Sequence, residues 1–191
     1  METNSEKMSA QQSLDLITEM IEKAKGNVKR NSFYFLLWGW TIVMANLGMF
    51  VLLHLPYEHP YVAWLITLPT WLYSMYRGYR QGQTEKTSTH LDNVTAWLWI
   101  SFGIVIFTLV AFGYKINFQL NPVILLVSAI PTLVSGMMIR FRPLIIGGGV
   151  FWVLGIVCFL VPQDIQYLIG AFAITAGYLI PGYLLKNKHN L

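Results

Sequence analysis

Six long apolar runs separated by short polar connections are the feature that most limits how this chain can fold. Each run is close to the length of about 20 residues that a helix needs to cross the hydrocarbon core of a bilayer. Lipid offers no partner to backbone N–H and C=O groups, so only helices or closed barrels span it, and runs without period-two alternation are not barrel strands. We therefore predict an all-α, polytopic membrane protein whose six transmembrane helices occupy residues 33–55, 60–77, 94–114, 122–139, 143–162 and 165–185.

The composition and the distribution of charge agree with a membrane environment. Hydrophobic residues make up 55% of the 191 residues and charged residues 12%, about half of the roughly 25% that is usual in soluble domains. The N-terminal segment, the connections after the second and fourth predicted spans and the C-terminal tail together hold 12 of the 13 Lys and Arg residues. Only Lys115 lies in one of the other connections, after the third predicted span. Because cytoplasmic loops carry an excess of Lys and Arg, we predict that both termini lie in the cytoplasm.

This pattern divides the chain into three parts. They are a cytoplasmic N-terminal segment (1–32), a six-helix transmembrane domain (33–185) and a cytoplasmic C-terminal tail (186–191). The lipid bilayer is therefore the first expected partner.

The N-terminal segment carries the pattern of an amphipathic helix. Leu14, Ile17 and Ile21 recur at intervals of three and four residues, which predicts one apolar stripe on a helix over residues 10–25. Gly26 is suited to end that helix. We expect the stripe to pack on the cytoplasmic ends of the bundle, on a second copy in a homo-oligomer, or on a cytoplasmic protein partner.

The same region carries a family resemblance. The stretch "SLDLITEMIEKAKGNVKRNSFYFLLWGW", over residues 13–40, resembles the start of a group of small, uncharacterised bacterial six-span inner-membrane proteins. These open with an acidic amphipathic helix that leads into an L-W-G-W sequence. The resemblance implies localisation in the bacterial inner (cytoplasmic) membrane, and it implies no activity, cofactor or site.

Two segments inside the apolar runs suggest an internal repeat. "LPTWLYSMYRGYR" at 68–80 aligns without a gap with "IPTLVSGMMIRFR" at 130–142. The alternative is chance similarity between two apolar segments that end in arginine. If the repeat holds, the protein is three helical hairpins of like orientation, and Pro69 and Pro131 mark equivalent kinks, because proline removes one helical hydrogen bond.

Small and polar residues inside the runs point to packing. We expect the fourth, fifth and sixth helices to pack closely through small residues, namely Ser128, Thr132, Gly136, Gly147, Gly148, Gly149, Gly170, Ala173 and Gly177. A substrate path lined by the kinked helices is the alternative. Asn46 is the strongest buried polar group and is expected to form an interhelical hydrogen bond, and Cys158 is expected to be a small buried hydrophobe.

No set of residues predicts a reaction centre. All nine Asp and Glu residues fall in the termini or connections, whereas ion-coupled pumps usually keep such groups within the membrane. His54, Glu58 and His59 have the residue types of a zinc site, but Pro56 and Pro60 break the helix that would give them regular spacing. We predict no catalytic, cofactor-binding or metal-binding residues and no cofactor.

Three classes of function are compatible with these features. The first is a non-enzymatic membrane protein, a sensor or accessory subunit that engages a cytoplasmic protein partner through residues 10–25. The second is a small transporter or channel for a neutral or lipophilic solute, favoured by the two prolines and the repeat. The third is a lipid-modifying enzyme. The first fits the lack of catalytic groups best, so we expect no enzyme activity and no nucleic-acid partner.

Overall fold

The computed structural model describes residues 10–84 and 90–187, and before Ser32 it describes the side chains of Gln11 and Leu14 alone. The all-α prediction is confirmed, because the described residues form helices and turns and no strand. In chain order the helical segments are α1 (Ala10–His54), η1 (Pro60–Ile66), α2 (Thr67–Thr84), α3 (His90–Ala111), η2 (Gly113–Ile116), α4 (Leu120–Met138), α5 (Arg142–Cys158), α6 (Gln163–Ile174), η3 (Thr175–Leu179) and α7 (Ile180–Asn187). Segments η1 and η2 are 3-10 helices, and η3 is a π-helical turn that joins α6 directly to α7.

Four helical stretches among the described residues are long and apolar enough to cross a membrane. They are Ser32–His54, Asn93–Ala111, Leu120–Met138 and Gln163–Asn187. Helix α5 is also apolar but has only 17 residues. The membrane character predicted from the sequence is therefore supported, although four helices rather than six meet this criterion.

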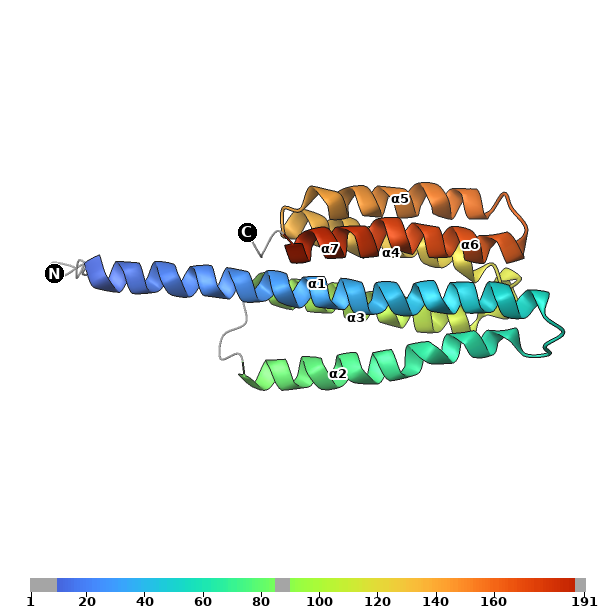
Figure 1. The fold of residues 1–191 in the computed structure, drawn as a ribbon, viewed down its shortest axis with the longest axis horizontal. Coiled ribbons are helices and arrows are strands. Elements are labelled where there is room, and N and C mark those ends of the chain that lie inside the picture. The colour runs from blue at the N-terminus through green and yellow to red at the C-terminus, as the bar shows by residue number, and fades with distance from the viewer. Residues whose placement is uncertain (1–9, 85–89, 188–191) are drawn as a thin grey trace.

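The helices run roughly along one axis, with α1 at the centre of the view in Figure 1. Helix α5 and the α6–η3–α7 segment lie on one side of α1, and α2 lies on the other side at some distance from it. The C-terminal end of α2, the α4–α5 turn, the first turn of α1 and the end of α7 lie toward the same end of the bundle (Figure 1). The first turns of α1 extend well beyond all other helices at that end.

The core lies between α4, α5, α6–η3–α7 and the middle of α1. Leu144, Phe151 and Cys158 on α5 are each 0% exposed, as is Thr132 on α4. Glycines bring the helix backbones together here: a Cβ on Gly147 would lie 2.6 Å from the carbonyl oxygen of Gly177. The predicted close packing of these helices through small residues is confirmed, and so is the burial of Cys158. Gly149 is the exception, because it is half-buried and nothing lies near its Cβ position.

Helix α1 corrects one prediction from the sequence. The helix begins at Ala10, but it continues without a break through Gly26 and residues 26–32 to His54. The expected helix end and linker are therefore wrong. One glycine in a helix interior costs only about 1 kcal/mol relative to alanine, and the surrounding Lys, Glu and Ala residues favour helix. The side chains of Ile17 and Ile21 lie outside the described part of the chain, so the docking of their stripe stays a prediction.

The two prolines that suggested a repeat occupy different places. Pro131 is buried inside α4, whereas Pro69 is the exposed third residue of α2, just after the 3-10 segment η1. Proline in a first helical turn removes no intrahelical hydrogen bond, so the two prolines do not occupy equivalent positions. The hairpins are not the sole packing units either, because α4 packs most closely on α5, and α1 contacts α6 as well as the η1–α2 segment that follows it. The predicted repeat is not confirmed.

Candidate functional site at the seam between α1 and α6

The C-terminal end of α1 meets the N-terminal end of α6 at the end of the bundle opposite the chain termini. Helix α1 ends at His54, shortly before Pro56, and α6 begins at Gln163, after Pro162 in an extended conformation. Asp164 lies in the first turn of α6 and His54 in the last turn of α1. An acidic residue in a first turn and a basic residue in a last turn interact favourably with the helix dipole. The packing of α1 on α6 brings His54 and Asp164 to one seam.

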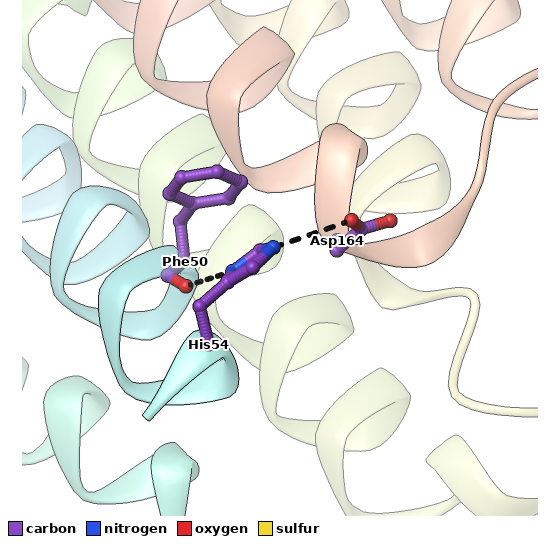
Figure 2. A network of polar contacts seen from close by, with 3 residues as sticks. All are labelled: Phe50, His54 and Asp164. Atoms are coloured by element: carbon purple, nitrogen blue, oxygen red, sulfur yellow. Dashed lines mark hydrogen bonds and ion pairs between the residues drawn. The ribbon is translucent and has the colours of Figure 1, made fainter. Parts of the chain in front are cut away.

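The imidazole of His54 is held by its own helix and faces Asp164. Its Nδ1 lies 2.9 Å from the carbonyl oxygen of Phe50, and its Nε2 lies 3.8 Å from Oδ2 of Asp164 (Figure 2). A carbonyl oxygen can only accept a hydrogen bond, so Nδ1 is the donor and carries the proton. The Phe50 ring also packs against the imidazole, with 4.5 Å between the two ring centres.

A pocket of about 300 Å³ opens beside this pair. Its lining, called the seam pocket below, consists of Met49, Leu53, His54, Gln163, Asp164 and Tyr167. Gln163 is anchored to the next connection, because its Nε2 donates to the carbonyl oxygen of Phe118 at 3.2 Å. The pocket therefore combines an apolar wall on α1 with polar groups on the first turn of α6.

Two pairs of carboxamides link helices near this end of the bundle and are called the amide layer below: Asn46 with Asn121, and Gln119 with Gln166. Nδ2 of Asn121 donates to Oδ1 of Asn46 at 3.3 Å, and Nε2 of Gln166 donates to Oε1 of Gln119 at 2.9 Å. Asn46 and Gln166 are each 1% exposed. The interhelical hydrogen bond predicted for Asn46 is confirmed. Gly170 makes room for it, since a Cβ there would lie 2.7 Å from Oδ1 of Asn46.

The three residues weighed as a zinc set are not brought together. His59 pairs with its neighbour Tyr61, whose hydroxyl lies 2.8 Å from Nδ1 of His59. His54 turns instead to Asp164, and Glu58 is an exposed loop residue. Within residues 10–84 and 90–187, no group of three or more His, Cys, Asp or Glu residues is placed to hold a metal ion.

Sequence reasoning missed the partners on the other side of the seam. Asp164 and Asn121 lie in connections between the predicted spans, and Gln166 lies in the predicted sixth span without an assigned role. The one signal that could have identified Gln166 is its position at the start of an apolar run, where a buried amide needs a partner. Comparison of the chain with known protein families, curated proteins and solved structures finds no match, so its function has to be argued from this geometry.

Proposed function

We propose that this protein is a non-enzymatic integral protein of the bacterial inner membrane, a sensor or accessory subunit that reports to a cytoplasmic protein partner through α1. The proposal includes six membrane crossings, with α5 and the joined η1–α2 segment running beside the four helices that meet the length criterion. At about 1.5 Å per residue, the 17 residues of α5 reach about 26 Å, close to the roughly 30 Å of a hydrocarbon core.

The charges on the two ends of the bundle support the proposed orientation. Among the described side chains, Lys and Arg gather at the end that also holds the chain termini, with Lys115 as the exception: Arg77, Arg80, Arg140, Arg142 and Lys186. Glu58 and Asp164 lie at the opposite end. Each cation near an anionic cytoplasmic leaflet is worth about 1 kcal/mol, which favours this end for the cytoplasm. Arg77 is also braced over the ring of Phe33 at 3.7 Å.

The observation that carries the proposed function is the unbroken helix α1. Its apolar stretch begins at Ser32, so the 22 residues before it, 10–31, form an arm that would extend about 33 Å at 1.5 Å per residue. The other end of the same helix lines the seam pocket. A rigid helix transmits a shift at one end to the other, so an event at the seam pocket would move the arm.

The packing of the core weighs against the transport alternative. Gly147 lies against Gly177, and a Cβ on Gly148 would lie 2.5 Å from the side chain of Leu133. The space between α4, α5 and η3 is thus filled by protein, which leaves little room for a solute path along α4. Transport and lipid modification have no specific observation in their favour.

The orientation is tested with single cysteines. In a Cys158→Ser background, a membrane-impermeant thiol reagent applied to intact cells should label Glu58→Cys and spare Thr87→Cys. The reverse pattern contradicts the orientation.

The partner function is tested by photo-crosslinking from the arm in living cells. A photoreactive phenylalanine at Ile17 or Ile21, on the apolar stripe, should give a discrete protein adduct, whereas the same group at Glu19 on the other face should give little. Adducts of a second copy would identify self-association through the arm. Equal labelling from both faces, or adducts with lipid only, contradicts the proposal.

A further inference from the structure

We infer that Arg77 on α2 and an exposed face of α1 form a binding site for one anionic phospholipid, with the phosphate at the guanidinium and an acyl chain along α1. The face, called the membrane stripe below, consists of Trp40, Met44, Leu47 and Val51. The inference rests on the proposed function only for the location of the chain in a membrane, and not for its orientation or its partner.

The guanidinium of Arg77 is held in place by an aromatic ring. Its central carbon lies 3.7 Å from the centre of the Phe33 ring, and Phe33 in turn packs near Tyr73, with 6.2 Å between the ring centres. An arginine can stack on an aromatic ring and still offer N–H donors in a planar fork that matches the oxygens of a phosphate. Arg77 is therefore positioned for an anion before one binds.

The charge of Arg77 has no acidic neighbour among the side chains that the structure describes. The acidic ones are Glu58 and Asp164, and both lie at the opposite end of the bundle. Arg77 is also half-buried, whereas Arg142 at the same end is exposed. Partly buried charges are screened less by salt and water than exposed ones, so Arg77 should attract an anion more strongly than Arg142.

The depth of Arg77 matches that of lipid phosphates. The apolar stretch of α1 begins at Ser32, so Phe33 and the guanidinium over it lie at the boundary between hydrocarbon and water. Basic sites at this level between transmembrane helices bind the headgroups of anionic lipids. The anion that reaches Arg77 in a membrane is therefore a lipid headgroup.

The membrane stripe continues from this site into the hydrocarbon. It follows Phe33 at helical intervals of three and four residues, so it lies on the same face of α1. Its side chains are 39–54% exposed. On one side, Trp40 donates from Nε1 to the hydroxyl of Tyr183 on α7 at 3.1 Å, and on the other side Arg77 of α2 covers Phe33. The stripe is thus an apolar surface between α2 and α7, which lie on opposite sides of α1 in Figure 1.

The length of the membrane stripe separates one leaflet from the other. One leaflet holds about half of the roughly 30 Å hydrocarbon core, which is about ten residues of helix at 1.5 Å each. Met44 lies 11 residues beyond Phe33, and Val51 lies 18 residues beyond it. A lipid with its phosphate at Arg77 therefore reaches Met44 with the end of its acyl chain and does not reach Val51.

The first test measures lipid binding to the purified full-length chain in detergent. Native mass spectrometry with added phosphatidylglycerol should show one bound lipid that an equal amount of phosphatidylcholine does not replace. Arg77→Gln should weaken this binding by at least about fivefold. The matched control is Arg142→Gln, which removes an exposed arginine from the same end of the bundle and should bind phosphatidylglycerol like the parent chain.

The second test locates the acyl chain. A photoreactive phenylalanine at Met44 should give an adduct with phosphatidylglycerol, and Arg77→Gln should abolish most of it. Val51 is the matched control, because it lies on the same stripe and is as exposed as Met44, at 53% against 54%. Any lipid adduct from Val51 should be unchanged by Arg77→Gln.

Several outcomes would overturn the inference. Equal losses in Arg77→Gln and Arg142→Gln, or equal binding of phosphatidylcholine, would mean general attraction to charge or to apolar surface. Displacement of the lipid by inorganic phosphate would identify a site for the free anion, and an adduct between two chains from Met44 would identify a protein helix on the stripe.

These measurements depend on neither the orientation in the cell nor the partner of the arm. A failure here is therefore distinct from a failure of the labelling and crosslinking experiments in cells. The temperature at which buried Cys158 becomes reactive toward a thiol dye verifies that each variant is folded.

Discussion

Helix α3 and the α6–η3–α7 segment are both apolar enough to cross a membrane, yet they differ completely in how they pack. None of the residues in the most apolar 18-residue stretch of α3 is buried, whereas 56% of those in the most apolar 18-residue stretch of Gln163–Asn187 are. Phe107 on α3 is 77% exposed, and Tyr178 in η3 is 6% exposed. Since lipid tails are as apolar as leucine, hydrophobicity alone does not draw helices together in a membrane. Helices associate where their backbones can approach closely, and small residues permit that approach.

The glycines illustrate this difference. Gly103 of α3 has nothing within 4 Å of its Cβ position, while a Cβ on Gly147 of α5 would lie 2.6–3.2 Å from the backbone of Gly177 in η3. We call α4, α5 and α6–η3–α7, with the stretch Ser32–His54 of α1, the packed half. We call η1, α2 and α3 the loose half.

Segment η1 packs along α1, and α2 is attached to α1 by polar and aromatic contacts. The hydroxyls of Thr41 and Thr70 lie 3.0 Å apart in a buried contact between α1 and α2. Nearer the end with the chain termini, Tyr34 donates to Oε1 of Gln81 at 3.3 Å, and Arg77 stacks on Phe33. Each such contact is worth about 0.5–2 kcal/mol. We therefore expect the packed half to be the stable unit and α2 and α3 to loosen first.

The largest effect is expected where two backbones touch. Gly147→Ala places a methyl group 2.6 Å from the carbonyl oxygen of Gly177, which forces α5 and η3 apart and destabilises the packed half by about 1–3 kcal/mol or more. The measurement is the temperature at which Cys158, buried on α5, reacts with a thiol dye in detergent.

The matched control lies two residues away on the same helix. Gly149→Ala adds the same methyl group where nothing lies within 4 Å, and alanine is the better helix former by about 1 kcal/mol. It should keep or raise the reaction temperature of Cys158. Equal losses in both variants would mean that helix propensity, and not close packing, distinguishes the packed half.

Much of this division could be predicted from the sequence, because it depends on residue types that act locally. The runs of small residues in the last three predicted spans indicated close packing, and an isolated Asn46 within an apolar run indicated an interhelical hydrogen bond. The path of the chain before Ser32 could not be predicted. Gly26 is equally suited to end a helix or to sit within one at a cost of about 1 kcal/mol.

The seam between α1 and α6 could not be predicted for a different reason. His54 and Asp164 meet only because α1 and α6 pack in one register, which depends on Gly170 leaving room for the Asn46 carboxamide. Local patterns carry no information on such a register. Pro69 was misread because the sequence does not reveal that η1 precedes it and that α2 begins only two residues before it.

A smaller effect distinguishes the hydroxyl contacts of the two halves. Tyr178→Phe removes the 3.1 Å contact with Thr132, at about 0.6–1.7 kcal/mol for an interhelical hydrogen bond in a membrane protein, and should lower the reaction temperature of Cys158. Thr70→Val removes a similar contact with Thr41 but should leave that temperature unchanged, because α2 loosens on its own. If Thr70→Val lowers it as much, the two halves unfold as one unit and the distinction fails.

The smallest effect is expected on the exposed face of α3. Phe107→Leu exchanges one apolar side chain for another at a position that is 77% exposed, and lipid solvates both. The melting temperature of the whole chain, followed by its helical circular dichroism, should correspond to a change within about 0.5 kcal/mol. The size of the protein on a native gel should also stay the same. A clear loss of stability together with a smaller assembly would mean that this face contacts a second copy, and that α3 belongs to an interface rather than to a lipid-facing loose half.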